Sequence, residues 1–126
     1  MDDVVFSGYQ RDSYLVNAHV PRFGSGEAKG VIDESVRGMD LYILVDVCNY
    51  SLTYSMSGNT NHMSPDDHYQ NLKRIIAAVG GKAKRINVIM PFLYESRQHK
   101  RSSRESLDCA LALQELTHMG VDNIIT

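Results

Sequence analysis

The chain has 126 residues, of which 43% are hydrophobic, so it can bury the core of one globular domain. Its formal net charge of -2 argues against general nucleic-acid binding, because domains that follow a phosphate backbone carry a positive excess. No apolar run approaches the ~20 residues that span a bilayer, and the first residues lack the pattern of a signal peptide. We therefore expect a cytoplasmic protein with neither a membrane nor a nucleic-acid partner.

The N-terminal third predicts short strands around a tight loop. Apolar residues at 4–6 and 13–20 favour strands, and residues 28–32 favour another. Between them, residues 22–27 (RFGSGE) contain two glycines and predict a turn. This turn is not a standard phosphate cradle, because the chain has no GxxxxGK[ST] and no GxGxxG that links a strand to a helix.

The continuous apolar run at residues 41–45 predicts a buried central strand, because it is rich in branched side chains. The next stretch, residues 49–65, is polar and predicts a surface loop, either a functional flap or a flexible insertion. Cys48 and Cys109 lie in no metal-binding motif, so we expect buried thiols in a reducing compartment. A redox or nucleophilic role is the alternative.

Two helices are predicted. Ser64, Pro65 and the acids at 66–67 begin the first, which ends at the glycines 80–81. Its apolar stripe consists of Leu72, Ile75, Ile76 and Val79. His68 lacks a second ligand at i+4, so a solvated or capping role is expected rather than metal binding. We expect Lys73 and Arg74 to face water or a neighbouring subunit.

The second helix begins near Ser106 or Leu107 and ends at Gly120.

Residues 84–126 predict a βαβ unit with strands at 86–90 and 121–126. The loop at residues 94–105, here called the cationic loop, contains Arg97, Lys100, Arg101 and Arg104 against only Glu95 and Glu105. Crevices form at the carboxyl ends of parallel strands, and the start of the following helix favours anions. A polyanion such as a nucleotide is the expected ligand. The alternative for Lys100, Arg101 and Arg104 is a solvated turn.

Three ordered segments resemble the ribose-phosphate diphosphokinase (phosphoribosyl pyrophosphate synthetase) family. Residues 22–27 are similar to the RFSDGE motif of the family. Residues 34–38 (ESVRG) match a second family motif, ESVRG, almost letter for letter. Residues 88–108 (VIMPFLYESRQHKRSSRESLD), followed by a helix and GVDNIIT, resemble its Arg-Gln loop and next strand. The resemblance spans residues 22–126. It implies an α/β, phosphoribosyltransferase-like three-layer domain with a mostly parallel central sheet flanked by helices.

The resemblance also implies an activity and its ligands. Members transfer the β,γ-diphosphoryl group of Mg-ATP to ribose 5-phosphate, which gives phosphoribosyl pyrophosphate and AMP. The Arg-Gln pair that holds ATP corresponds to Arg97 and Gln98, and this suits a guanidinium fork and an amide. Phe23 and Glu27 correspond to residues that reach the adenine of a neighbouring subunit's ATP, and Ser25 replaces the usual Asp or Asn. A homo-oligomer is therefore implied.

The resemblance implies two domains, and we expect residues 1–126 to correspond to the N-terminal one, with the C-terminal domain absent. The metal-binding Asp-Leu-His motif would follow Thr126, and the catalytic and ribose-phosphate loops belong to the second domain. We therefore expect no catalytic residue and no Mg²⁺ ligand in this chain. Because phosphoryl transfer depends on positioning and charge stabilisation, this part should be inactive alone.

Some residues depart from the family pattern. His99 stands where an Asp commonly follows Arg-Gln. Asp46 replaces a Ser that helps to bind regulatory phosphate in many members, and a carboxylate would repel that anion. The stretch 50–63 lengthens a loop that is compact in familiar members, so oligomer contacts should differ.

Two other functions compete with the enzyme. One is a regulatory relative similar to the synthetase-associated proteins, which keep the fold and act by association. The other is a small module whose basic loop binds RNA or a phosphorylated partner. The charge balance and the lack of aromatic residues interleaved with the cationic loop argue against this module.

Overall fold

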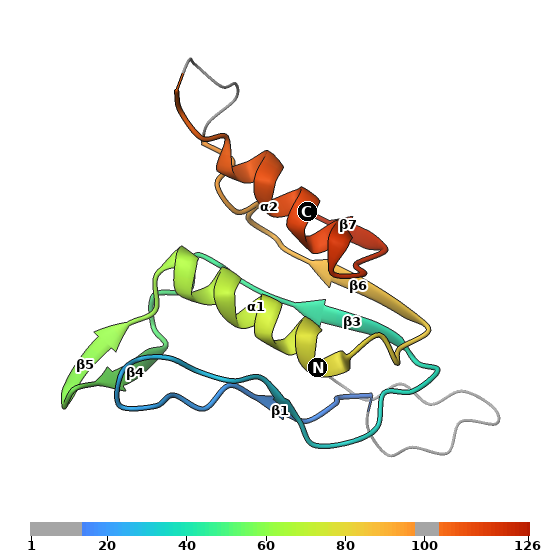
Figure 1. The fold of residues 1–126 in the computed structure, drawn as a ribbon, viewed down its shortest axis with the longest axis horizontal. Helices are drawn as coiled ribbons and strands as arrows, with labels where there is room; N and C mark the ends of the chain where they lie inside the picture. The colour runs from blue at the N-terminus through green and yellow to red at the C-terminus, as the bar shows by residue number, and fades with distance from the viewer. Residues whose placement is uncertain (1–13, 98–103) are drawn as a thin grey trace.

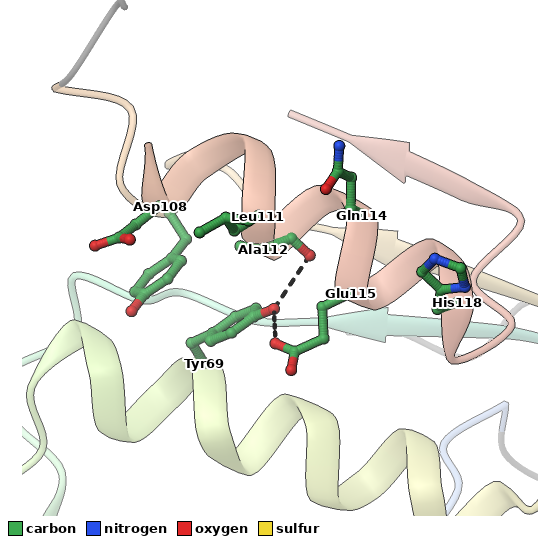
Figure 2. Close-up of a pocket in the computed structure, with 8 residues that line it drawn as sticks. Tyr69, Asp108, Leu111, Ala112, Gln114, Glu115 and His118 are labelled. Atoms are coloured by element: carbon green, nitrogen blue, oxygen red, sulfur yellow. Dashed lines mark hydrogen bonds between the residues drawn. The ribbon is translucent and has the colours of Figure 1, made fainter. Parts of the chain in front are cut away.

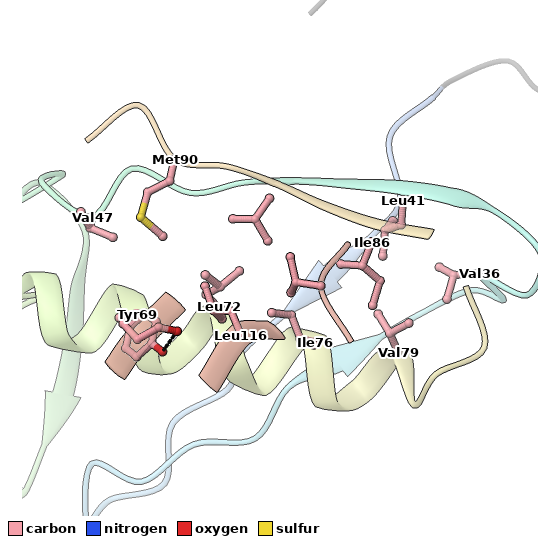
Figure 3. Close-up of a cluster of buried hydrophobic side chains, with 13 residues drawn as sticks. Val36, Leu41, Val47, Tyr69, Leu72, Ile76, Val79, Ile86, Met90 and Leu116 are labelled. Carbon is pink, nitrogen blue, oxygen red and sulfur yellow. Dashed lines mark hydrogen bonds between the residues drawn. The ribbon is translucent and has the colours of Figure 1, made fainter. Parts of the chain in front are cut away.

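The computed structural model describes residues 14–97 and 104–126. Its centre is a three-stranded parallel sheet in the order β3-β6-β7. The two helices lie side by side over one face of this sheet, as Figure 1 and Figure 3 show. The elements are β1 (Ala18–His19), β2 (Val31–Ile32), β3 (Asp40–Leu44), β4 (Thr53–Met56), β5 (Asn59–His62), α1 (Pro65–Val79), β6 (Arg85–Ile89), α2 (Asp108–His118) and β7 (Asn123–Ile125). This parallel sheet with its helices confirms the predicted α/β class.

Helix α1 has the predicted bounds because its caps are local. The Ser64 hydroxyl accepts a hydrogen bond from the Asp67 amide at 3.1 Å, and the Ser64 amide donates one to the Asp67 carboxylate at 2.9 Å. This reciprocal pair is a capping box. The helix ends where Gly80 adopts the left-handed conformation, with φ 62°.

The core lies between the sheet and the two helices (Figure 3). Helix α1 contributes Leu72, Ile76 and Val79, and helix α2 contributes Ala112 and Leu116. The predicted apolar stripe is therefore buried, except that Ile75 is only half-buried. Helix α2 begins at Asp108, within two residues of the predicted start near Ser106 or Leu107, and Gly120 follows the helix with φ 100°.

The prediction that residues 41–45 form a central strand is wrong. Strand β6 lies between β3 and β7, and its Val88 is fully buried (0% exposed). In β3 only Leu41 is buried, while Tyr42 is 57% exposed. The reason is that β3 is an edge strand whose second face is not covered by any described element. An apolar run therefore marked the strand but not its place in the sheet.

The polar stretch after Cys48 is not a structureless loop. Strands β4 and β5 form an antiparallel hairpin that turns at Ser57 and Gly58, with φ angles of 51° and 80°. Positive φ at both positions is typical of the tight turn that matches the twist of a hairpin.

Three further expectations are wrong. Cys48 is exposed, because it lies in a turn where its amide donates to the Asp46 carboxylate at 3.1 Å. His68 is buried, and its Nε2 lies 2.6 Å from the backbone oxygen of Asn49. Lys73 faces helix α2 rather than water, with Nζ 3.1 Å from Glu115 Oε1. The partners of His68 and Lys73 are distant in the sequence, and the exposure of Cys48 depends on the turn that contains it.

Strands β1 and β2 are shorter than residues 13–20 and 28–32, which were predicted for them. The strand expected at residues 4–6 lies outside the described residues. Among the helices that the structure describes, none is long and apolar enough to cross a bilayer.

Candidate nucleotide-binding site

The loop between β1 and β2 spans Arg22–Glu27 and forms a closed turn, here called the β1–β2 loop. The Phe23 amide donates to the backbone oxygen of Glu27 at 2.7 Å, and the Gly26 amide donates to the backbone oxygen of Phe23 at 2.9 Å. Gly26 has φ 92°, a conformation that suits glycine. The predicted turn is therefore confirmed, and its backbone is held by internal hydrogen bonds.

The three predicted ligand residues of this loop face outward. Phe23 is 51% exposed, and Ser25 and Glu27 are also exposed. The Glu27 amide donates to the Ser25 hydroxyl at 3.4 Å, so the Ser25 side chain lies beside the backbone of Glu27. One loop thus presents an aromatic ring, a hydroxyl and a carboxylate to the surroundings.

Arg22 anchors the β1–β2 loop to helix α1. Its Nη1 donates to the Gly26 oxygen at 2.8 Å, and its Nη2 donates to Asn71 Oδ1 at 3.3 Å. Arg74 donates to the same Asn71 oxygen at 2.7 Å. Burial, followed by the nearby Arg22 charge, lowers the pKa of Arg74 below its usual value. The loop is therefore tied to the same helix that covers the sheet.

The cationic loop leaves the carboxyl end of β6 and is described at both of its ends. The Met90 amide donates to the Ile125 oxygen at 2.7 Å, which holds the start of the connection beside β7. Arg97 is exposed at the end of the first described part. Glu95 (φ 60°) and Arg104 (φ 62°) adopt left-handed conformations that non-glycine residues rarely adopt. Gln98, His99, Lys100 and Arg101 lie outside the described residues.

Tyr94 fixes the base of the cationic loop on helix α1. Its ring stacks on Tyr69 at a centroid distance of 4.3 Å, and its hydroxyl donates to the Asp66 carboxylate. The Tyr69 hydroxyl lies 2.8 Å from Glu115 Oε1 and 3.1 Å from the Ala112 oxygen (Figure 2).

Burial, followed by a hydrogen bond to a carboxylate, raises the pKa of Tyr69 and of Tyr94 above the usual value for tyrosine. The hydrogen bonds from Tyr69 and Lys73 lower the pKa of Glu115. The two phenols therefore remain protonated hydrogen-bond donors at neutral pH.

Two hollows of about 520 Å³ flank helix α2. The first lies between the helices and is lined by Tyr69, Tyr94, Asp108, Leu111, Ala112, Gln114, Glu115 and His118 (Figure 2). Its two carboxylates make it unsuitable for phosphate. The second lies at the helix N-terminus and is lined by Arg104, Glu105, Ser106, Leu107, Ala110, Leu111 and Gln114. It adjoins the cationic loop, so an anion bound by the loop would lie nearest to this second hollow.

The two loops that hold the predicted site residues lie apart. The β1–β2 loop lies beside the β4–β5 hairpin, whereas the described ends of the cationic loop lie beyond the N-terminal end of α2 (Figure 1). One copy of the chain thus groups Phe23, Ser25 and Glu27 on the β1–β2 loop but does not bring the described ends of the cationic loop to them.

Sequence analysis missed the residues that hold these loops. Arg22 appeared only as one letter of a turn, and neither Asn71 nor Tyr94 carried a recognisable signal. A signal for the hairpin did exist, because Ser57-Gly58 separates two short runs with alternating side chains.

The described residues contain no group of three or more His, Cys, Asp or Glu side chains that could hold a metal ion.

A family model described as the N-terminal domain of ribose phosphate pyrophosphokinase matches residues 9–120 of the chain. The chain belongs to this family. The predicted resemblance is thereby confirmed, and it extends further toward the N-terminus than the segments that suggested it.

Curated ribose-phosphate pyrophosphokinases are similar to this domain. Ribose-phosphate pyrophosphokinase B of Dictyostelium discoideum is 32% identical over 111 residues, which are 87% of this chain and 30% of the relative. Ribose-phosphate pyrophosphokinase 1 of Schizosaccharomyces pombe is 37% identical over 107 residues, which are 83% of this chain and 23% of the relative. The chain thus spans less than a third of the length of these relatives.

A solved structure supports the same fold. The crystal structure of phosphoribosylpyrophosphate synthetase from Mycobacterium smegmatis aligns with a TM-score of 0.71 and 28% identity, over 90% of this chain and 34% of that one. The predicted fold class of this ribose-phosphate pyrophosphokinase domain is therefore confirmed. The roles of Phe23, Ser25, Glu27, Arg97 and Gln98 remain predictions.

Proposed function

We propose that this ribose-phosphate pyrophosphokinase domain binds ATP for the transfer of its diphosphoryl group to ribose 5-phosphate. The products would be phosphoribosyl pyrophosphate and AMP. In this proposal the domain contributes ATP contacts and contacts between subunits, and it positions the nucleotide rather than performing the chemical step.

The observation that carries the proposal is the exposure of Phe23 on a well-held loop. A phenyl ring that is 51% exposed beside an exposed hydroxyl and carboxylate offers a stacking face and hydrogen-bond acceptors. The exocyclic amine of adenine is a donor that such acceptors can bind. Stacking of a base on an aromatic side chain contributes about 1–3 kcal/mol. The β1–β2 loop therefore suits a base better than a phosphate.

Arg97 and Gln98 supply the complementary chemistry. A guanidinium offers a planar fork to phosphate oxygens or stacks on a base, and an amide can bind the edge of adenine. The exposure of Arg97 at the start of a cationic loop supports this role, because its charge is available to an anion. Gln98, which lies outside the described residues, is proposed to act beside it.

The separation of the two loops supports a site shared between subunits. In one chain the β1–β2 loop lies beside the hairpin, at the other side of the sheet from the described ends of the cationic loop (Figure 1). A single nucleotide can contact both loops only if they come from different copies. We therefore infer a homo-oligomer in which Phe23, Ser25 and Glu27 of one copy face the ATP held by Arg97 and Gln98 of another.

Bound Mg²⁺ would neutralise the developing charge on the phosphates. We infer that residues 1–126 act as the N-terminal domain of a two-domain enzyme. The metal-binding motif would follow Thr126, and the catalytic and ribose-phosphate loops would lie in the second domain. The small share of its relatives that the chain covers supports this inference.

Calorimetry with Mg-ATP tests the proposal. We expect Arg97→Ala combined with Gln98→Ala to weaken or abolish binding. Arg85→Ala is a matched control, because it removes an exposed cation on β6 that lies near Asp40 instead. ATP binding that is unchanged in the double variant would contradict the proposed site. Salt-sensitive RNA retention without nucleotide selectivity would instead support a small binding module.

A further inference from the structure

The β4–β5 hairpin lies directly against the β1–β2 loop, although about thirty residues separate them in sequence. The Ser57 amide donates a hydrogen bond to the Gly24 oxygen at 2.8 Å. The Arg22 guanidinium lies over the Tyr54 ring, 4.2 Å from its centroid. A Cβ added to Gly26 would lie 2.7 Å from the sulfur of Met56. The hairpin thus contacts the loop through its turn and through strand β4.

Each contact restrains a different part of the loop. The Ser57 hydrogen bond holds the backbone between Phe23 and Ser25. Tyr54 holds Arg22, whose guanidinium in turn binds the Gly26 oxygen. Met56 fills the space that a side chain at position 26 would occupy. The loop cannot change its shape without breaking at least one of these contacts.

The hairpin itself is anchored. The Tyr50 ring stacks on the His62 ring at a centroid distance of 4.2 Å, and His62 Nδ1 lies 2.8 Å from the backbone oxygen of Tyr50. The Met63 amide donates to the Leu52 oxygen at 2.9 Å. These contacts close the base of the hairpin immediately before helix α1 begins.

We propose that the β4–β5 hairpin is a clamp on the β1–β2 loop and that Tyr54 is its positioning residue. Tyr54 acts through Arg22, and thereby holds Phe23, Ser25 and Glu27 in one arrangement for a nucleotide base. The clamp rests on the contacts above, whereas its consequence for nucleotide binding rests on the proposed function. A loop held in its bound shape loses less conformational freedom when ligand binds, so the clamp raises affinity.

Amide hydrogen exchange, measured by NMR without nucleotide, tests the clamp by itself. Tyr54→Leu removes the aromatic face under Arg22, whereas Tyr54→Phe retains it and is the matched control. We expect exchange at the Phe23, Gly26 and Ser57 amides to rise by a factor on the order of ten in Tyr54→Leu only. The Met90 amide, which donates to Ile125, reports that the sheet is intact.

Met56→Ala provides a second, independent variant. It removes the side chain that packs on Gly26, so the Gly26 amide should exchange faster while the Met90 amide does not change. Unchanged exchange in both Tyr54→Leu and Met56→Ala would overturn the clamp, whatever the nucleotide affinity.

ATP affinity in the same variants separates the clamp from the proposed function. We expect Tyr54→Leu to weaken Mg-ATP binding several-fold, by less than Phe23→Ala does, and Tyr54→Phe to leave it unchanged. Faster exchange with affinity unchanged in both Tyr54→Leu and Phe23→Ala would support the clamp and refute the nucleotide role of the loop. Affinity that falls in Phe23→Ala but not in Tyr54→Leu would overturn the positioning role of Tyr54.

Discussion

Tyr69 and Tyr94 stack face to face, with ring centroids 4.3 Å apart and an angle of 8° between the ring planes. Tyr69 belongs to helix α1, and Tyr94 begins the cationic loop. The pair therefore connects the helix that covers the sheet with the loop that contains Arg97. Because each hydroxyl also bonds to a carboxylate, the pair is held at both ends.

Tyr94→Phe should lower the free energy of unfolding by about 1 kcal/mol, because it removes the hydrogen bond to Asp66 but keeps the stacked ring. Tyr94→Ala should cost about 3 kcal/mol, because the ring contacts are lost as well. Urea denaturation measures both values. Tyr42→Phe is the control, since Tyr42 is exposed on β3 and its change should stay within about 0.5 kcal/mol. Equal effects at positions 42 and 94 would contradict the anchoring role of Tyr94.

Stability should fall at alkaline pH. The pKa of Tyr69 and of Tyr94 is raised above the value of about 10 that is usual for tyrosine, so the folded state retains protons that the unfolded state releases. The stabilisation is fully present below the unfolded pKa and is lost as pH rises toward the folded pKa. Urea denaturation between roughly pH 8 and pH 11 should show this loss. The double variant Tyr69→Phe, Tyr94→Phe should show a shallower slope, and an unaltered slope would refute the assignment.

Leu116→Ala should destabilise the chain by about 2–5 kcal/mol, because Leu116 is 1% exposed in the core beneath the sheet. Leu111→Ala on the same helix is the matched control, since Leu111 is 55% exposed and should change stability by about 0.5 kcal/mol or less. Thermal and urea unfolding can both measure the difference. Similar losses for the two variants would show that α2 does not pack on the face described.

Gly30→Ala should be destabilising by about 1–3 kcal/mol, because its Cβ would lie 2.3 Å from the backbone oxygen of Arg74. A backbone atom in helix α1 cannot move aside as a side chain can. Gly24→Ala is the matched control, since no heavy atom lies within 4 Å of its added Cβ. A stable Gly30→Ala variant would mean that the start of β2 does not lie against α1.

Phe23→Ala should weaken Mg-ATP binding about tenfold, the loss expected from one stacked base. The fold should be unaffected, because the Phe23 side chain is exposed. Calorimetry measures the affinity, and Tyr42→Ala removes another exposed aromatic residue as a comparison. A loss of affinity of the same size in Tyr42→Ala would argue against a specific base site on the β1–β2 loop.

Local chemistry determined the helices. The cap at Ser64 and the stop at Gly80 each involve groups within a few residues, so the sequence predicts the bounds of α1 without any tertiary contact. The start of α2 was also predicted to within two residues. Three short segments were enough to suggest the family, which the family model then confirmed.

Tertiary structure decided the order of the strands, the burial of single side chains and the arrangement of the loops, because these depend on contacts between segments that are distant in the sequence. The runs that form β3 and β6 are alike in composition, and only pairing makes β6 central. His68 is buried because Asn49 comes to lie beside it, and no local pattern encodes that contact. The packing of Tyr54 on Arg22 and the separation of the β1–β2 loop from the described ends of the cationic loop likewise depend on how the chain turns back on itself. Capping and periodicity act over one or two helical turns, whereas these contacts join segments that only the folded chain brings together.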